Sequence, residues 1–492
     1  VSEYLADAAP RVEAMKARQD DIVSLMAQAA GQELTVGSRY VNAVNAVSLR
    51  IPYGKLDTIR AVDGVRNAYV QRVYDRPVTT AGTAIEGKFA HSYNMTGLGD
   101  VWAQGFTGQG MLVAVMDTGL DLNYTTWGNF QTGIRRVHEA FTEDSFKSEL
   151  NDSQLRYTNG SLARFLQTTQ LMSTTGIDGQ KITYGNNDLY KNRKVPYAAD
   201  YADGDLNVMP SESDHGTHVA GIIAAENNKI GGIGVAYNCK VMVLKAGNSS
   251  GYFNNSDIAE AIQYAYMNGA DVINMSFGGS NISFAVEEAL ENAYTTSVLV
   301  AAAGNDGACN NLSCQECDKV GVSYPAALPY VIGVMSTDKD GKHLSSFSNY
   351  DHNPYDSIEY EVYAVGEGVG STWPSNKYAC LNGTSMAAPT VAGIAALLRS
   401  YYSDREVYST KFIQSQIVNT GTVNPHMSLM GDGHVTDEAH SVADVVEALT
   451  KLPKPSVNLY DYYIDDSTSI NSNNNGNGVV DAGETVRLYI SL

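Results

Sequence analysis

The stretch "ADVINMSFGGSNISFAVEEALENAYTTSVLVAAAGND", residues 270–306, decides the fold class, because two short apolar runs enclose a segment of helical pattern. Wholly apolar strands that alternate with helices are typical of a parallel sheet covered by helices on both faces. The same alternation recurs in "MLVAVMD" (111–117), "VAGIIAA" (219–225), "CKVMVLKA" (239–246) and "DIAEAIQYAYMNG" (257–269). We therefore predict an α/β domain built on a parallel sheet.

The length of 492 residues and the changes of pattern predict several units. A helical stretch followed by a strand-helix-strand pattern predicts a small α+β unit, and a segment without periodicity predicts a linker. The predicted boundaries are 1–80 for the small unit, 81–94 for the linker, 95–452 for the α/β domain with an insertion in loops at 121–205, and 453–492 for the start of a β domain.

Charge and hydropathy exclude some classes of partner. A formal net charge of -21 argues against nucleic acid and anionic membranes, and suits a protein that binds cations. No run of eighteen apolar residues is present, so we expect no membrane span in this chain. Three of the five cysteines form C-x4-C-x2-C in "ACNNLSCQECDK", residues 308–319, which favours a local disulfide or reduced thiols over a zinc site.

Three further segments place a carboxylate, an imidazole and a hydroxyl at element boundaries: "AVMDTGLD" with Asp117, "DHGTHVAG" with His215 and "NGTSMAAP" with Ser385. A serine hydroxyl becomes a good nucleophile when an imidazole takes its proton, and that imidazole needs a carboxylate to orient it. "AAAGND" adds Asn305 as a donor for an oxyanion. Taken singly, Ser385 fits a helix N-cap and Asp117 fits a turn.

The ordered set of four segments resembles the subtilisin-like serine protease family (peptidase S8), whose triad runs Asp, His, Ser. The resemblance covers about residues 95–450, and the long insertion resembles the larger lactocepin-like members. It implies that Asp117 orients His215, that His215 acts as general base and then acid, that Ser385 attacks, and that Asn305 and the Ser385 N–H bind the oxyanion. The implied protein is a secreted or cell-envelope endopeptidase for proteins or peptides, with no cofactor in its chemistry.

The same resemblance implies a groove in which substrate backbone is held as an added strand. The residues implied to bind substrate are Asn274, Ser276, Phe277, Gly278, Gly279, Ala303, Gly304 and Ser323. Ser323 stands where the family often has glycine, which predicts a somewhat narrower pocket. Rival hypotheses are a catalytically silent scaffold, which should lack a triad member, and an acyl esterase, which should have a deep apolar pocket in place of the groove.

Structural calcium is a further expectation at two places. The stretch "AAENNKIGGIGVA", residues 224–236, resembles a family calcium loop and implies Asn228 with the carbonyls of Glu226, Ile230 and Gly232, although the usual aspartate partner after Asp121 is missing. In the tail, a twelve-residue loop pattern indicates a second site, with an Asn-rich turn as the alternative; its candidates are Asn473, Asn475, Asn477, Asp481 and Glu484.

The small unit at residues 1–80 gains a role from the resemblance, since it looks like a propeptide that assists folding and inhibits the enzyme until cleaved. Its end should enter the cleft, which predicts self-cleavage between Tyr74 and His91. An ordinary accessory domain is the alternative.

Overall fold

The computed structural model describes most of the first 451 residues and two short strands beyond them. The described residues are 2–40, 45–70, 73–74, 84–85, 97–122, 124–127, 133–136, 138–142, 173–175, 181–183, 194–203, 207–210, 214–248, 250–309, 321–351, 358–421, 423–429, 433–437, 440–451, 461–465 and 487–491. The chain separates into two compact units, Val1–Lys451 and Leu452–Leu492.

The first unit is built on a seven-stranded sheet in the order β10-β11-β5-β13-β14-β15-β16, and every pair in it is parallel. This confirms the predicted α/β architecture. The strands are β10 (Tyr197–Asp200), β11 (Lys240–Lys245), β5 (Leu112–Asp117), β13 (Val272–Met275), β14 (Val298–Ala302), β15 (Ile332–Thr337) and β16 (Val362–Val365). Because β10 lies inside 121–205, that segment is more than an insertion in loops: it contributes an edge strand of the sheet.

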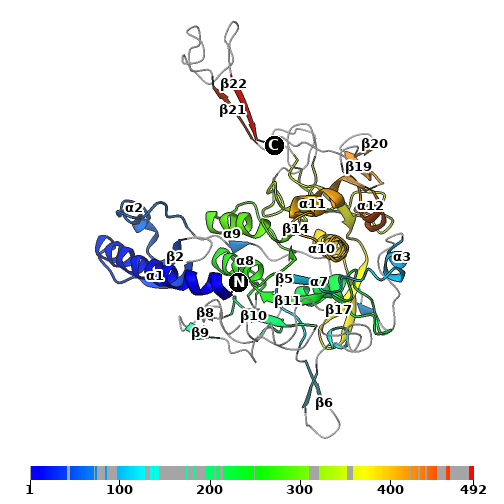
Figure 1. Ribbon diagram of the computed structural model, residues 1–492, viewed down its shortest axis with the longest axis horizontal. Helices are drawn as coiled ribbons and strands as arrows, with labels where there is room; N and C mark the ends of the chain where they lie inside the picture. The colour runs from blue at the N-terminus through cyan, green and yellow to red at the C-terminus, as the bar shows by residue number, and fades with distance from the viewer. Residues whose placement is uncertain are drawn as a thin grey trace. The chain divides into compact units, whose positions relative to one another are not determined.

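Helices cover both faces of the sheet (Figure 1). Val113 and Val115 of β5 share an apolar cluster with α7 (His215–Ala224) and α10 (Thr384–Tyr401). Leu112 and Ala114 face the opposite way, toward α8 (Asn255–Met267) and α9 (Phe284–Tyr294). This alternation along one strand is the period of two that a sheet buried on both faces requires. The smaller helices beside α7 and α10 are α3 (Leu98–Ala103), α11 (Thr410–Asn419) and α12 (Val445–Thr450).

The amino-terminal residues add a hairpin to the predicted order of elements. Helix α1 (Ser2–Ala30) precedes an antiparallel hairpin, β1 (Thr35–Tyr40) and β2 (Ala46–Arg50), and then η1 (Tyr53–Lys55) and α2 (Leu56–Arg60). The predicted strand-helix-strand order is found as β2, α2 and β3 (Val73–Tyr74), but β1 and its pairing with β2 were not predicted. Met26, Ala30, Leu34 and Ile59 form the small apolar core.

The remaining strands form small antiparallel sheets. In the first unit these are β17 (Val369–Trp373), β18 (Lys377–Leu381) and β4 (Ala84–Ile85); β3 (Val73–Tyr74) with β12 (Phe253–Asn254); β6 (Tyr124–Trp127) with β7 (Gly133–Arg136); β8 (Ser173–Thr175) with β9 (Lys181–Thr183); and β19 (His426–Leu429) with β20 (Gly433–Thr436). The second unit contains the hairpin of β21 (Asp461–Asp465) and β22 (Arg487–Ser491).

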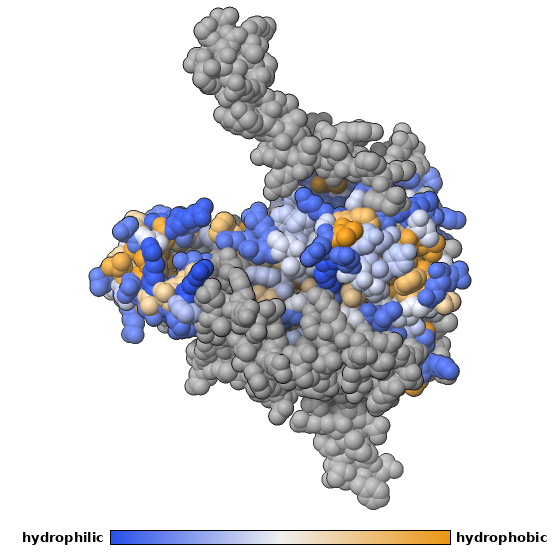
Figure 2. Space-filling view, in the orientation of Figure 1, coloured by the Kyte–Doolittle hydropathy of each residue, from blue (hydrophilic) through white to orange (hydrophobic). Residues whose placement is uncertain are grey.

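The described surface is largely polar on the face drawn in Figure 2. On the face drawn in Figure 2, hydrophilic residues in blue cover much of the described surface and apolar residues form scattered patches. Among the described residues, no helix is both long enough and apolar enough to cross a membrane.

Candidate active site

Asp117 and His215 form a buried pair at one end of the central sheet. Asp117 is the last residue of β5, and His215 is the first residue of α7. Nδ1 of His215 lies 2.8 and 3.1 Å from the two carboxylate oxygens of Asp117, and their side chains are 5% and 2% exposed. A Cβ on Gly216 would lie 2.3 Å from the carbonyl oxygen of Gly119, so only glycine lets α7 begin this close to the turn after β5. With Nδ1 held by the carboxylate, Nε2 is the ring nitrogen left to take up a proton.

Ser385 is the second residue of α10, while Gly383 is the N-cap, so the serine does not cap the helix. Its Oγ donates a hydrogen bond of 3.0 Å to the carbonyl oxygen of Ser276, just beyond β13. Nδ2 of Asn274, which is fully buried, donates to Oγ of Ser276 at 3.0 Å. Nε2 of His215 is buried and has no hydrogen-bond partner among the described residues. The Ser385 hydroxyl is therefore bonded to Ser276 and not to the imidazole in this structure.

The side-chain amide of Asn305 is held in one orientation beyond the end of β14. Its Oδ1 accepts from the N–H of Thr384 at 2.8 Å and from the Thr384 hydroxyl at 2.9 Å. Oγ1 of Thr384 in turn accepts from the N–H of Gly304 at 3.1 Å, and the carbonyl of Ala303 accepts from Nδ2 of Asn349 at 2.9 Å. Because Oδ1 faces Thr384, the Nδ2 donor lies on the other side of the amide.

Several residues predicted to bind substrate lie together beyond β13 and β14. A Cβ on Gly278 would lie 2.4 Å from Oγ of Ser323, and a Cβ on Gly304 would lie 3.4 Å from Cβ of Ser323. Gly279 and Tyr324 exchange two backbone hydrogen bonds, of 3.0 and 2.8 Å. The tertiary structure thus brings three separate segments into one wall, and a side chain at either glycine would fill the space beside Ser323.

A second strand edge lies near this wall, at β12. It was not predicted from the sequence, which indicated residues 274–279 as the edge that binds a substrate strand. Strand β3 pairs antiparallel with β12, and Tyr74 stands opposite Phe253. The Tyr74 side chain is buried, its ring lies 6.0 Å from that of Phe277, and a Cβ on Gly279 would lie 3.0 Å from it. The Gly-Tyr-Phe sequence after β11 was the only local signal for β12.

Comparison with known proteins identifies the family of this fold and site. Residues 108–445 match the family model for Peptidase_S8, described as the subtilase family. The chain belongs to the subtilase family. Subtilisin DY of Bacillus licheniformis is 39% identical over 247 residues, which cover 50% of this chain and 84% of that protein. Subtilisin Savinase of Lederbergia lenta is 38% identical over 234 residues, 47% of this chain and 79% of that protein.

For a third relative, the match covers a smaller share of the relative's own length. The Thermostable alkaline protease of Halalkalibacterium halodurans is 39% identical over 234 residues, which are 47% of this chain and 59% of that protein. The resemblance read from the sequence is thereby confirmed, and this subtilase is a subtilisin-like serine endopeptidase.

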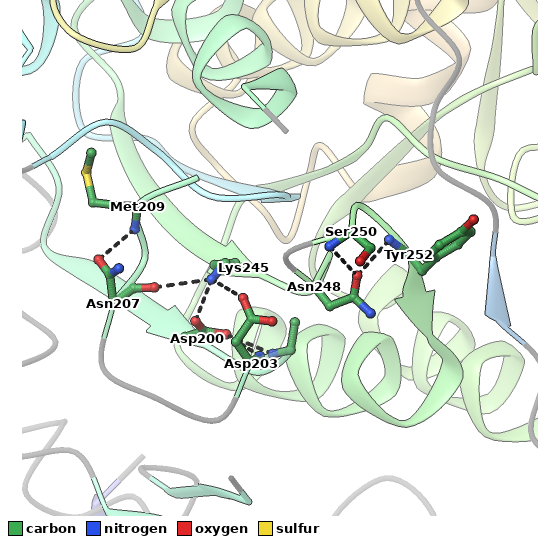
Figure 3. Close-up of polar contacts among 9 residues, drawn as sticks. Asp200, Asp203, Asn207, Met209, Lys245, Asn248, Ser250 and Tyr252 are labelled. Atoms are coloured by element: carbon green, nitrogen blue, oxygen red, sulfur yellow. Dashed lines mark hydrogen bonds and ion pairs between the residues drawn. The ribbon is translucent and has the colours of Figure 1, made fainter. Parts of the chain in front are cut away.

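A buried charge cluster lies where β10 and β11 of this subtilase end (Figure 3). The Lys245 ammonium lies 2.8 Å from Oδ2 of Asp200 and 2.5 Å from Oδ2 of Asp203. Burial raises the pKa of Asp200 to about 6, although the Lys245 charge acts in the opposite direction. Lys245 stands opposite Asp117 in the sheet, so the cluster supports the edge from which the Asp117 carboxylate projects.

The calcium loop predicted in the subtilase does not fit a metal site. Oδ1 of Asn228 accepts from the N–H of Ile230 at 2.9 Å, and its Nδ2 donates to the carbonyl of Glu139 at 2.8 Å. The carbonyl of Glu226 accepts from the N–H of Asn228 at 2.9 Å. Oδ1 of Asn228 and the carbonyl of Glu226 are therefore already engaged by N–H donors. Over the described residues, no group of three His, Cys, Asp or Glu side chains has the arrangement of a metal site.

The other cysteine and calcium predictions are only partly covered. Cys309 is disulfide-bonded, which is one of the two alternatives favoured over a zinc site, whereas Cys239 and Cys380 carry free thiols. The remaining candidates lie outside the described residues: Cys314 and Cys317, and in the tail Asn473, Asn475, Asn477, Asp481 and Glu484. Most of the predicted cleavage segment, residues 75–83 and 86–91, also lies outside them.

Proposed function

We propose that this subtilase hydrolyses peptide bonds through Ser385, His215 and Asp117. The observation that carries the proposal is the buried pair of His215 and Asp117, because the carboxylate fixes Nδ1 and leaves Nε2 to accept a proton. Oγ of Ser385 bonds to the scissile carbonyl carbon while its proton passes to Nε2. His215 then gives this proton to the leaving amine as the carbon–nitrogen bond breaks, and water releases the acyl group by the reverse sequence.

The developing oxyanion accepts hydrogen bonds from Nδ2 of Asn305 and from the N–H of Ser385. The support for this role is the orientation of the Asn305 amide, whose Oδ1 is already engaged by two donors of Thr384. A donor that is fixed before reaction costs no reorganisation in the transition state. The start of α10 adds the positive end of a helix dipole at the same place.

We further propose that residues 1–80 act as an intramolecular inhibitor. Two observations support this. Tyr74 is buried beside Phe253 and Phe277, at the edge where a substrate strand would pair. The hydroxyl of Tyr69 accepts a hydrogen bond of 3.1 Å from the N–H of Ala285, in the first turn of α9. The unit thus occupies the groove and also caps a helix of the catalytic body.

We also propose self-cleavage between Tyr74 and His91, because Tyr74, near the end of residues 1–80, is held in β3 against β12 beside the groove residue Phe277. Protein or peptide chains are then the substrates, bound as an added strand along β12 and residues 276–279. Secretion or a cell-envelope location stays the expectation from the family resemblance.

The test is covalent labelling by a fluorophosphonate combined with mass spectrometry of the purified chain. We expect Ser385→Ala to lose labelling, peptide hydrolysis and cleavage between residues 74 and 91, whereas Ser403→Ala, on an exposed serine, keeps all three. Persistence of that cleavage in the Ser385→Ala chain purified with protease inhibitors would show that another protease makes it. Full hydrolytic activity in Ser385→Ala would refute the assignment of the nucleophile.

A further inference from the structure

We infer that Glu139 fastens the loop 226–232 to the β17–β18 hairpin by hydrogen bonds, so that this loop is held without a metal ion. The inference concerns the stability of the fold and not the proposed chemistry. It assigns a role to a residue of the 121–205 segment that the family resemblance leaves without one.

Three polar groups of Glu139 contact the hairpin, and a fourth contacts the loop. Its N–H donates to Oδ1 of Asn376 at 2.9 Å, and its Oε2 accepts from Nδ2 of the same residue at 3.1 Å. Its Oε1 accepts from the hydroxyl of Tyr378 at 2.7 Å. Its carbonyl oxygen accepts from Nδ2 of Asn228 at 2.8 Å. A single residue therefore joins two segments that are far apart in the sequence.

Neighbouring contacts close the same junction. Nε2 of His138, which is fully buried, lies 3.1 Å from the carbonyl oxygen of Lys377. Gly231 has a φ of 62°, and a Cβ there would lie 2.0 Å from the ring of Tyr378. The loop therefore packs directly on the tyrosine, and only glycine meets both the backbone angle and the space.

The bonding pattern explains why a calcium ion does not suit this place. Calcium takes six to eight oxygen ligands, whose lone pairs must point at the ion. Here the Glu139 carboxylate receives donors from Tyr378 and Asn376, and Oδ1 of Asn228 receives the N–H of Ile230. An ion would have to compete with these donors for the same oxygens. The hydrogen bonds from Tyr378 and Asn376 thus stabilise the negative charge of the Glu139 carboxylate in place of a cation.

The hairpin held in this way contacts the elements that carry the candidate site. Nε2 of His218 in α7 lies 3.0 Å from the carbonyl oxygen of Ala379, and Oγ of Ser371 donates to the carbonyl of His218 at 2.7 Å. The same helix begins with His215, and β18 leads after a short turn to Ser385. Loss of the Glu139 contacts should therefore lower the stability of the β17–β18 hairpin and of the helix starts that it contacts.

The experiment is thermal unfolding of the full chain in the Ser385→Ala background, which prevents self-digestion. We expect the same unfolding temperature in millimolar calcium and in excess chelator. Glu139→Ala should lower it by about 2–6 °C in both solutions, because two side-chain hydrogen bonds are lost and the buried Tyr378 hydroxyl is left without its acceptor. Glu406→Ala, an exposed residue with the same change of charge, should leave it unchanged.

Two further variants make the outcome decisive. Tyr378→Phe removes one donor with little change of shape, and its effect should be smaller and non-additive with Glu139→Ala. A rise of the unfolding temperature in calcium that disappears in Asn228→Ala would overturn the inference. So would a Glu139→Ala chain as stable as the Glu406→Ala control. A calcium effect that survives Asn228→Ala places the ion elsewhere in the chain and supports the inference for this loop.

Discussion

Asn305 and Thr384 are joined by two hydrogen bonds that end on one atom, Oδ1 of the asparagine, at 2.8 and 2.9 Å. The two residues come from the end of β14 and from the first position of α10, and Ser385 directly follows Thr384. The strand that carries the proposed oxyanion donor and the helix that carries the proposed nucleophile are therefore coupled by one amide.

Asn305→Ala should lower kcat by about 10²- to 10³-fold with little change in KM, because the lost donor acts on charge that develops in the transition state. Steady-state kinetics on a peptide substrate checks this. A rise in KM of the same size with unchanged kcat would show that Asn305 contributes to ground-state binding instead.

Thr384→Val should lower kcat more than Thr384→Ser, because valine keeps the shape but loses the hydroxyl that holds Oδ1 of Asn305. The serine variant retains that donor and is the matched control. In the Asn305→Ala background the difference between the two Thr384 variants should largely disappear, which a double-mutant cycle measures. If the difference persists there, Thr384 acts independently of the amide.

Tyr74→Ala should make Ser385 more accessible in the uncleaved chain. The tyrosine side chain is buried between the groove residues Phe253 and Phe277, and removing it costs the packing energy of a large aromatic group. We expect faster fluorophosphonate labelling of freshly prepared chain than in wild type, whereas Tyr53→Ala, at a side chain with 79% exposure, should label at the wild-type rate. Equal rates for both variants would mean that Tyr74 does not shield the groove.

Lys245→Met should destabilise the fold, and more strongly at about pH 8 than at about pH 5. The substitution leaves Asp200 and Asp203 buried without their cation. Burial already raises the pKa of Asp200 to about 6, so its destabilising ionisation grows as pH rises through that value and is relieved below it. Urea unfolding in the Ser385→Ala background, with Lys411→Met on an exposed lysine as control, measures the difference. A loss that is independent of pH would contradict the electrostatic account.

His440 lies between two carboxylates in a buried cluster far along the chain from the triad. Its Nδ1 is 2.8 Å from Oδ2 of Asp437 and its Nε2 is 3.2 Å from Oδ2 of Asp351. Burial alone would lower the pKa of His440, but the hydrogen bonds and charges of these two aspartates outweigh it and raise the pKa from 6.5 to about 10. The hydroxyl of Tyr363 donates to Asp437 at 2.8 Å, and burial holds the pKa of the nearby Glu361 well above its usual range.

The raised pKa predicts a stability that falls with alkaline pH. The contribution of His440 is fully present below about pH 6.5 and is lost as pH rises toward about 10, with a slope of up to about 1.4 kcal/mol per pH unit. We expect His440→Gln to be less stable than wild type near neutral pH and to lack this alkaline decline. Urea unfolding at several pH values, again with Ser385→Ala, tests it. A variant with the same alkaline slope as wild type would assign that slope to other groups.

Much of the fold was predictable from local pattern. Apolar runs such as 111–117 and 298–302 became strands of one parallel sheet, since burial on both faces requires an uninterrupted apolar strand. The pairing of Asp117 with His215 was implied by the family resemblance, and the structure brings the two side chains together. The β1–β2 hairpin, the strand β12 and the contacts of Glu139 were not predicted.

The features that were not predicted share one physical reason. A two-residue strand such as β12 has no periodicity to recognise, and its pairing with β3 depends on a residue about 180 positions away. The loop 226–232 has the local sequence of a calcium site, but Glu139, Asn376 and Tyr378 reach it only in the folded chain.

By itself the sequence therefore determined the parallel α/β sheet, because burial on both faces requires apolar strands, whereas its resemblance to a family implied Asp117, His215, Ser385 and Asn305 as the candidate site residues. Only the tertiary structure decided how Asn305 is oriented by Thr384, which edge holds Tyr74, and what fills the place expected for calcium. Hydrogen bonds between distant segments form only when the core has packed, so no local pattern records them.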